Sequence, residues 1–182
     1  MKKLIIAGAI MLLSSAGAFA QTSYGLKGGL NISSVRIPDS NVKSLLGFHV
    51  GGFTTTQISD RFALQPELLY SQQGYKDAKY DYRFHYLNVP LIFKGTIAGG
   101  LHAQVGPQFG ILLNATRKEG KVSEDITKKK FDSAVGLGFG YDMSVLQFSA
   151  RYNLGLTDTN DNGLGFNGFT NNVFQLSVGV SL

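Results

Sequence analysis

The segment NNVFQLSVGVSL, residues 171–182, alternates between apolar side chains and side chains that are polar or very small. Phe174, Leu176 and Val178 share one parity, and Gln175 lies on the other. A period of two is typical of a β-strand whose two faces meet different surroundings. Terminal residues usually fray into water. Alternation up to the last residue therefore predicts that this segment is paired within a sheet.

Seven further segments share this rhythm and are rich in aromatic and branched residues, which is the signature of strands. The pattern is least regular in 46–57, because Phe48 and Val50 lie on one parity and Phe53 on the other. With 173–182 as the last, the predicted strands are 24–33, 46–57, 61–74, 85–95, 101–114, 131–143 and 145–157. Prolines at 66, 90 and 107 fall inside them, and we expect β-bulges to absorb the lost ladder bonds.

The connections between these strands alternate in length. The long ones are 34–45, 75–81, 115–130 and 157–170, and the short ones are 58–60, 96–100 and a turn near Met143. An up-and-down antiparallel barrel has this pattern, with tight turns at one rim and longer loops at the other. A Greek-key sandwich needs crossing connections and does not. We therefore predict an all-β, eight-stranded barrel in which 173–182 closes against 24–33.

The N-terminus has the features of a secretory signal peptide. Lys2 and Lys3 precede an apolar run from Leu4 to Leu13, and Ala18-Phe19-Ala20 forms a cleavage site. The run is shorter than the roughly 20 residues that a membrane-spanning helix needs. We predict cleavage after Ala20, so that 1–20 is the signal peptide and 21–182 is the barrel domain.

Composition excludes several classes of protein. The 182 residues contain no cysteine, so neither a disulfide framework nor a cysteine-linked lipid is expected. Charged residues make up 16 %, against about 25 % in a typical soluble domain. The cluster Lys128-Lys129-Lys130 is one loop run without interleaved aromatic residues. Nucleic acid is therefore not an expected partner.

The position of the charges indicates which face of the strands meets lipid. The polar parity is mainly Gly, Ser, Asn and Gln, whereas a soluble exterior would carry Lys and Glu on strand after strand. The charges within strands all lie on that parity: Lys27, Glu67, Lys94, Asp132, Asp142 and Arg151. A lipid-facing Lys or Arg at the midplane costs about 2–4 kcal/mol. This one-sidedness favours a transmembrane barrel, and the alternative is a soluble lipocalin-like ligand-binding barrel with an apolar interior.

Eight strands enclose a bore just wide enough for side chains to fill it. Charges that face this bore must find partners there. We therefore predict a structural charge cluster of Lys27, Glu67, Lys94 and Arg151, in which Glu67 bridges two or more of the cations.

The sequence resembles the PorT-type outer-membrane β-barrel family over nearly the whole mature chain. The similarity is carried by GLKGGLNIS (25–33), GFHVGGF (47–53), LQPELLYSQQGY (64–75), YLNVPLIFK (86–94), GPQFGILL (106–113), GLGFGYDM (136–143) and ARYNLGLTD (150–158). The resemblance implies an eight-stranded barrel in the outer membrane. The member that gives the family its name takes part in a secretion and gliding apparatus, which makes an accessory role in secretion one alternative.

Nothing in the sequence predicts catalysis. Small outer-membrane enzymes need a Ser–His–acid or comparable set, and only His85, with Ser71 or Ser123, could approach one. The stretch TDTNDNG (157–163) superficially resembles a calcium loop but lacks its closing glutamate. No catalytic residue, metal or cofactor is predicted. We expect a structural or interaction barrel that contacts outer-membrane lipid and presents loops 115–130 and 157–170 to other envelope proteins, with a narrow channel as the alternative.

Overall fold

The computed structural model describes residues 22–36, 43–76, 80–119, 122–125, 131–157 and 170–182. The predicted signal peptide and its cleavage site lie outside these residues, as does almost all of the 157–170 connection. Within the described ranges, no helix is long and apolar enough to span a membrane.

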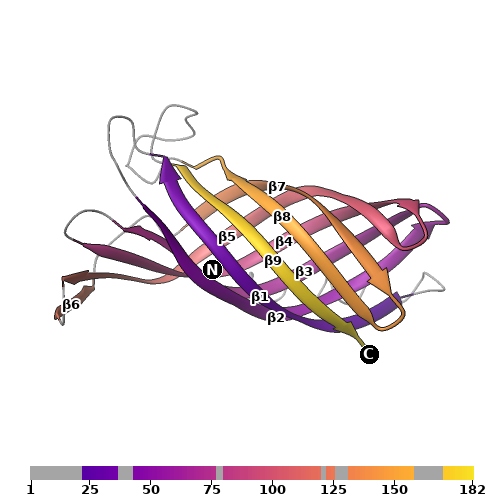
Figure 1. Cartoon of the computed structure of the whole chain (residues 1–182), viewed down its shortest axis with the longest axis horizontal. Coiled ribbons are helices and arrows are strands. Elements are labelled where there is room, and N and C mark those ends of the chain that lie inside the picture. The colour runs from indigo at the N-terminus through magenta and orange to yellow at the C-terminus, as the bar shows by residue number, and fades with distance from the viewer. Residues whose placement is uncertain (1–21, 37–42, 77–79, 120–121, 126–130, 158–169) are drawn as a thin grey trace, which may run out of the picture.

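The described residues form one antiparallel sheet that curls into a tilted cylinder (Figure 1). Its strands are β1 (Thr22–Arg36), β2 (Lys43–Ser59), β3 (Phe62–Lys76), β4 (Asp81–Ala98), β5 (Leu101–Glu119), β6 (Val122–Asp125), β7 (Phe131–Met143), β8 (Leu146–Gly155) and β9 (Thr170–Ser181). The strand order is β4-β3-β2-β1-β9-β8-β7-β5-β6, and an additional β4–β5 pairing closes the ring. Eight of the nine described strands make up the barrel, because the short β6 pairs with an extension of β5.

The last strand closes against the first, as the terminal alternation predicted. β9 pairs with β1 from Gly25↔Ser181 to Arg36↔Thr170. The backbone N–H of Leu182 also donates to the carbonyl oxygen of Tyr24 at 2.7 Å. The prediction of an eight-stranded up-and-down barrel is confirmed, because consecutive barrel strands pair with each other all the way round the ring.

The two rims of the barrel differ. We call the end with tight connections the turn rim: β2–β3 turns at residues 60–61, β4–β5 at 99–100 and β7–β8 at 144–145. Gly99 and Gly100 have φ values of 50° and 96°, in the left-handed region that glycine adopts without steric penalty. The opposite end, the loop rim, is where the longer connections leave the strands.

The two faces of the wall have the polarity of a membrane barrel. Apolar side chains point away from the axis, with Leu26 63 % exposed and Phe139 61 % exposed. Polar side chains such as Asn31 and Gln65 point inward and are fully buried. A lipocalin-like cup needs the opposite arrangement, so that alternative is not favoured. The barrel is a transmembrane one.

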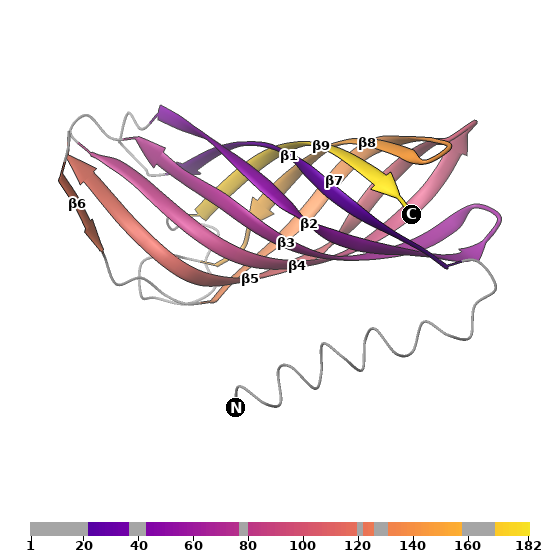
Figure 2. The ribbon, with the colours of Figure 1, turned by 90° about the horizontal axis from the view of Figure 1, so that it is seen from below.

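The connection 115–130 is shorter than the sequence indicated. β5 continues to Glu119, and its last four residues, Thr116–Glu119, pair with β6 in a hairpin. This hairpin lies at the loop-rim end of the barrel (Figures 1 and 2). The sequence interpretation ended the strand where the apolar alternation stops. A hairpin above the apolar band needs no apolar face, so polarity alone could not reveal it.

The expectation that bulges absorb the prolines is wrong. On β3 and β4, Pro66↔Leu91 and Leu69↔Asn88 belong to one unshifted register. The same holds on β4 and β5 around Pro90↔Gln108. Pro66 lies opposite the residue that follows Pro90, so the missing N–H donors of these two strands fall in one small patch. The ladder therefore loses bonds locally without changing which face each side chain occupies.

Candidate functional site

The four residues of the predicted charge cluster come from four strands and all point into the bore. Lys27 lies on β1, Glu67 on β3, Lys94 on β4 and Arg151 on β8, and each is between 2 % and 4 % exposed. Their strands lie on opposite sides of the ring, so only barrel closure brings them near one another.

Glu67 binds two cations at once. Its Oε1 accepts from Lys27 Nζ at 2.6 Å and from Arg151 Nη2 at 2.9 Å, and its Oε2 accepts from Arg151 Nη1 at 3.1 Å. The arginine contact is bidentate, the strongest arrangement for a guanidinium and a carboxylate. The bridge crosses the bore from β1 through β3 to β8.

Two glutamines extend the bridge. Gln65 Nε2 donates to Glu67 Oε1 at 2.9 Å. Gln104 Oε1 accepts from Arg151 Nε at 3.2 Å and from Nη2 at 3.0 Å. These amides bind atoms of the charged groups that the ion pairs do not fully satisfy. A buried charge needs such additional hydrogen-bond partners. Sequence reasoning assigned them only to the polar face.

Lys94 does not join Glu67. Its Nζ binds Asp142 Oδ2 at 2.6 Å and lies 3.3 Å from Gln65 Oε1. The Asp142 side chain is 36 % exposed, because this pair lies near the turn rim. The structure thus brings together three of the four predicted residues and gives the fourth a separate partner close to solvent.

An aromatic ring packs beside the bridge. Phe53, on β2, is 4 % exposed, and Lys27 Nζ lies 5.8 Å from its ring centroid. A Cβ atom on Gly25 would collide with the ring, and one on Gly179 would lie 3.1 Å from Phe53 Cε1. The irregular parity of 46–57 therefore marks an apolar residue that fills the bore, and the glycines leave room for it.

A second, uncharged polar layer centres on His49, which is 1 % exposed. Its Nδ1 lies 2.8 Å from Asn31 Oδ1, and its Nε2 lies 2.9 Å from Ser177 Oγ. Gln175 Nε2 donates to Asn31 Oδ1 at 3.1 Å. This layer was not predicted from the sequence. Its only signal was that His49 stands on the polar parity between Phe48 and Val50.

Further along β3, β4 and β5, towards the loop rim, the inward face becomes aromatic. Phe84 and Tyr86 are 5 % and 3 % exposed and pack with Leu112 and Ala115. Tyr75 stacks on Tyr82 at 4.7 Å between ring centroids and packs against the same group. From the turn rim to the loop rim, the inner face of the wall thus carries first a charged layer, then a neutral polar layer and then an aromatic layer.

The residues considered for catalysis do not meet. The Ser71 hydroxyl accepts from Asn31 inside the bore at 3.0 Å. His85 is on the outward parity, where its Nδ1 lies 2.6 Å from the Tyr70 hydroxyl. The side chain of Ser123 and the stretch TDTNDNG, apart from Thr157, lie outside the described residues. In the described ranges, no group of three His, Cys, Asp or Glu residues is placed to hold a metal ion.

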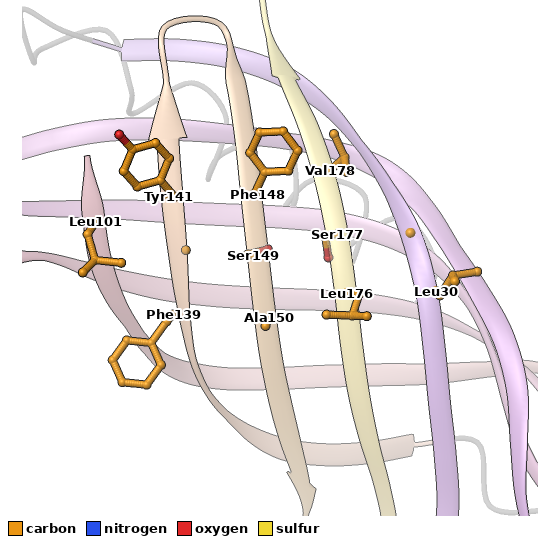
Figure 3. A pocket seen from close by; sticks show the side chains of 12 residues that line it. Leu30, Leu101, Phe139, Tyr141, Phe148, Ser149, Ala150, Leu176, Ser177 and Val178 are labelled. Carbon is orange, nitrogen blue, oxygen red and sulfur yellow. The ribbon is translucent and has the colours of Figure 1, made fainter. Parts of the chain in front are cut away.

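The outer wall carries a groove of about 540 Å³ (Figure 3). Ala150 forms part of its floor, and Phe139, Phe148 and Leu176 project beside it. A second groove of about 350 Å³ shares Phe139. Both have mostly apolar linings and lie on the outward, lipid-facing wall, so neither is a ligand cavity within the bore.

Comparisons with known proteins agree with this geometry. A family model described as "Outer membrane protein beta-barrel domain" matches residues 19–161. The crystal structure of Ail, the attachment invasion locus protein of Yersinia pestis, is 16 % identical, with a TM-score of 0.58 over 89 % of this chain and 99 % of that one. Neisserial surface protein A is 14 % identical, with a TM-score of 0.59 over 88 % and 97 %. At these identities the likeness shows the fold alone. The curated proteins give no match to the sequence.

Proposed function

The chain belongs to the outer membrane protein beta-barrel domain family, and on this premise we propose that it is a closed barrel with a structural or interaction role. The family places it in the outer membrane. The bridge of Lys27, Glu67 and Arg151 across the bore is the observation that carries the proposal.

Several layers support closure. A permeating ion must displace the bridge, whose three members are each at most 4 % exposed. It must then pass the His49 layer, where the side chains bond to one another across β1, β2 and β9. Breaking a buried ion pair costs about 3–5 kcal/mol, because it leaves a charge without a partner in a low-dielectric site. Such a barrier favours a filled bore over a pore.

Conductance tests the closed bore. We expect no steady current when the purified mature protein is inserted into a planar bilayer, provided that folding is verified by the mobility shift of unheated protein in gels. The matched control is a folded porin inserted under the same conditions. Steady, stepwise current from the folded wild type would refute the closed barrel and favour the narrow channel.

Interaction through the loop rim is the finer part of the proposal. Outer-membrane barrels have short periplasmic turns and longer extracellular loops, which directs the loop rim and the β5–β6 hairpin outward. A protein partner, including a PorT-like secretion apparatus, would contact 115–130 and 157–170. Co-purification from outer membranes with a variant in which 116–125 is replaced by a short turn tests this. A defined complex that survives the replacement would exclude the hairpin as the contact.

The separation of Ser71 and His85 on opposite faces supports a role without catalysis. Hydrolysis of a lipid ester by the purified protein, lost in Ser71→Ala, would overturn that part of the proposal.

A further inference from the structure

Basic side chains gather on the outward face of the loop rim at β2, β3 and β4. We call Lys43, Lys76 and Arg83 the rim cations. β2, β3 and β4 lie side by side at this end of the barrel (Figure 2). On the far side of this rim, outward positions such as Ser133 on β7 and Asn172 on β9 are neutral. The rim cations Lys43, Lys76 and Arg83 thus lie together on the β2–β4 side of the barrel.

Two of the rim cations oppose each other directly. Lys43 and Lys76 are cross-strand partners in the β2–β3 ladder, which places them on the same face. Like charges in this position are destabilising. Asp81, the next residue in the row, binds Lys76 Nζ at 3.2 Å, but both side chains are more than a third exposed, so this surface pair contributes little. Among the residues of this row whose side chains the structure describes, one carboxylate thus faces three cations.

Arg83 adds a donor that is already desolvated. It lies between Gly74 on β3 and Thr116 on β5 in the ladders. Its Nε atom is buried and has no hydrogen-bond partner in the described structure. A buried donor without a partner costs about 1–3 kcal/mol, and Gly74 has no side chain that could supply one. Arg83 as a whole is partly exposed, so an anionic oxygen at this surface would bind the guanidinium group from outside and not through the buried Nε itself.

The height of the rim cations matches the headgroup layer. Leu46 is 63 % exposed and marks the apolar band on β2, three residues from Lys43. Three residues of a strand tilted by about 40° advance roughly 8 Å along the barrel axis. The headgroup layer extends about 5–8 Å beyond the hydrocarbon on each side. Lys43 therefore lies at the depth of lipid headgroups.

An aromatic group marks the same boundary. On the outward face, the ring centroids of Phe48 and Tyr70 are 5.9 Å apart, and those of Tyr70 and His85 are 6.0 Å apart. Aromatic rings with a polar tip collect where hydrocarbon meets headgroups. The rim cations lie directly beyond this group along β2, β3 and β4.

We propose that Lys43, Lys76 and Arg83 form a binding site for the phosphate groups of an anionic glycolipid in the outer leaflet. Phosphate oxygens accept charge-assisted bonds from ammonium and guanidinium groups, and the lipid tails would lie along the apolar wall below. The site depends on the outward orientation of the loop rim but not on closure of the bore.

Native mass spectrometry of the full mature protein, in neutral detergent with diphosphorylated lipid A, tests the site. Lys43→Gln with Arg83→Gln should weaken retention about tenfold or more, since each cation near an anionic lipid surface contributes appreciably. Arg61→Gln removes a charge from an exposed position in the β2–β3 turn at the opposite rim and should bind as the wild type does. The charge-conserving Lys43→Arg should also retain binding, and the gel mobility shift verifies that every variant is folded.

Three results would overturn the proposal. The double variant could bind lipid A as tightly as the wild type. Dephosphorylated lipid A could bind equally well, which would exclude phosphate recognition. Inorganic phosphate at millimolar concentration could displace the lipid, which would indicate a site for the free anion. A finding of ion conductance would refute the closed bore and leave the rim site standing.

Discussion

Replacing Glu67 by glutamine should lower the free energy of unfolding by about 3–5 kcal/mol, the usual cost of breaking a buried ion pair. The carboxylate accepts three short bonds from Lys27 and Arg151, and its side chain is fully buried. Glutamine has nearly the same shape, so packing is preserved while the negative charge is lost. Two cations then remain in the bore without an anion, and the amide N–H₂ faces one of them.

Urea unfolding in detergent or lipid vesicles measures this effect. The chain has no tryptophan and eight tyrosines, so tyrosine fluorescence and far-UV circular dichroism are suitable signals. Unheated gels, in which folded and unfolded barrels migrate differently, give an independent midpoint. The matched control is Lys76→Gln, which breaks an exposed pair and should change stability by no more than about 1 kcal/mol.

A double-mutant cycle separates charge from packing. In an Arg151→Met background, fewer cations are left unpaired, so Glu67→Gln should cost less than in the wild type. Contacting residues commonly show coupling of about 0.5–3 kcal/mol. A loss below about 1 kcal/mol for Glu67→Gln alone, or additive losses in the cycle, would refute the view that the bridge is an interdependent charge cluster.

Three further changes test other features. Leu176→Arg puts a charge on the lipid-facing wall and should destabilise the barrel by about 2–4 kcal/mol in urea unfolding from lipid vesicles; an unchanged midpoint would place that face away from hydrocarbon. Lys94→Met should cost only about 1 kcal/mol by the same measurement, because Asp142 is partly exposed and can be hydrated; a loss as large as that of Glu67→Gln would show this pair to be equally desolvated. Gly25→Ala forces a methyl group against the Phe53 ring and the backbone oxygen of Val180, and it should lower stability by about 1–3 kcal/mol or reduce the yield of folded barrel in gels; full yield and stability would show that both the ring and the β9 backbone can move aside.

The sequence predicted most of the architecture because a barrel wall has a short-range signature. The two-residue alternation assigns the strand residues to the correct face. Lipid around the barrel explains why the outward positions of the apolar band, below the rim cations, carry no charge. The ends of the strands were predicted less accurately where the chain leaves the apolar band, because polarity there no longer distinguishes the inward face from the outward face. The β5–β6 hairpin was missed for this reason, and the prolines were expected to shift a register that in fact continues.

Within the bore, alternation predicted that Lys27, Glu67, Lys94 and Arg151 face inward, and the structure buries all four. Alternation could not pair them. Lys94 binds Asp142, and Glu67 binds the other two cations. His49 and Phe53 also lie inside, although no pattern in the sequence connects either residue with its partners.

The sequence by itself determined a closed, eight-stranded wall and the surroundings of each face, because strand period and connection length are local properties of the chain. Only the tertiary structure decided which charges meet across the bore. Contacts such as Arg151 with Glu67 join residues 84 positions apart. They depend on strand tilt and on the register summed around the whole ring, and no local stretch of sequence contains that sum.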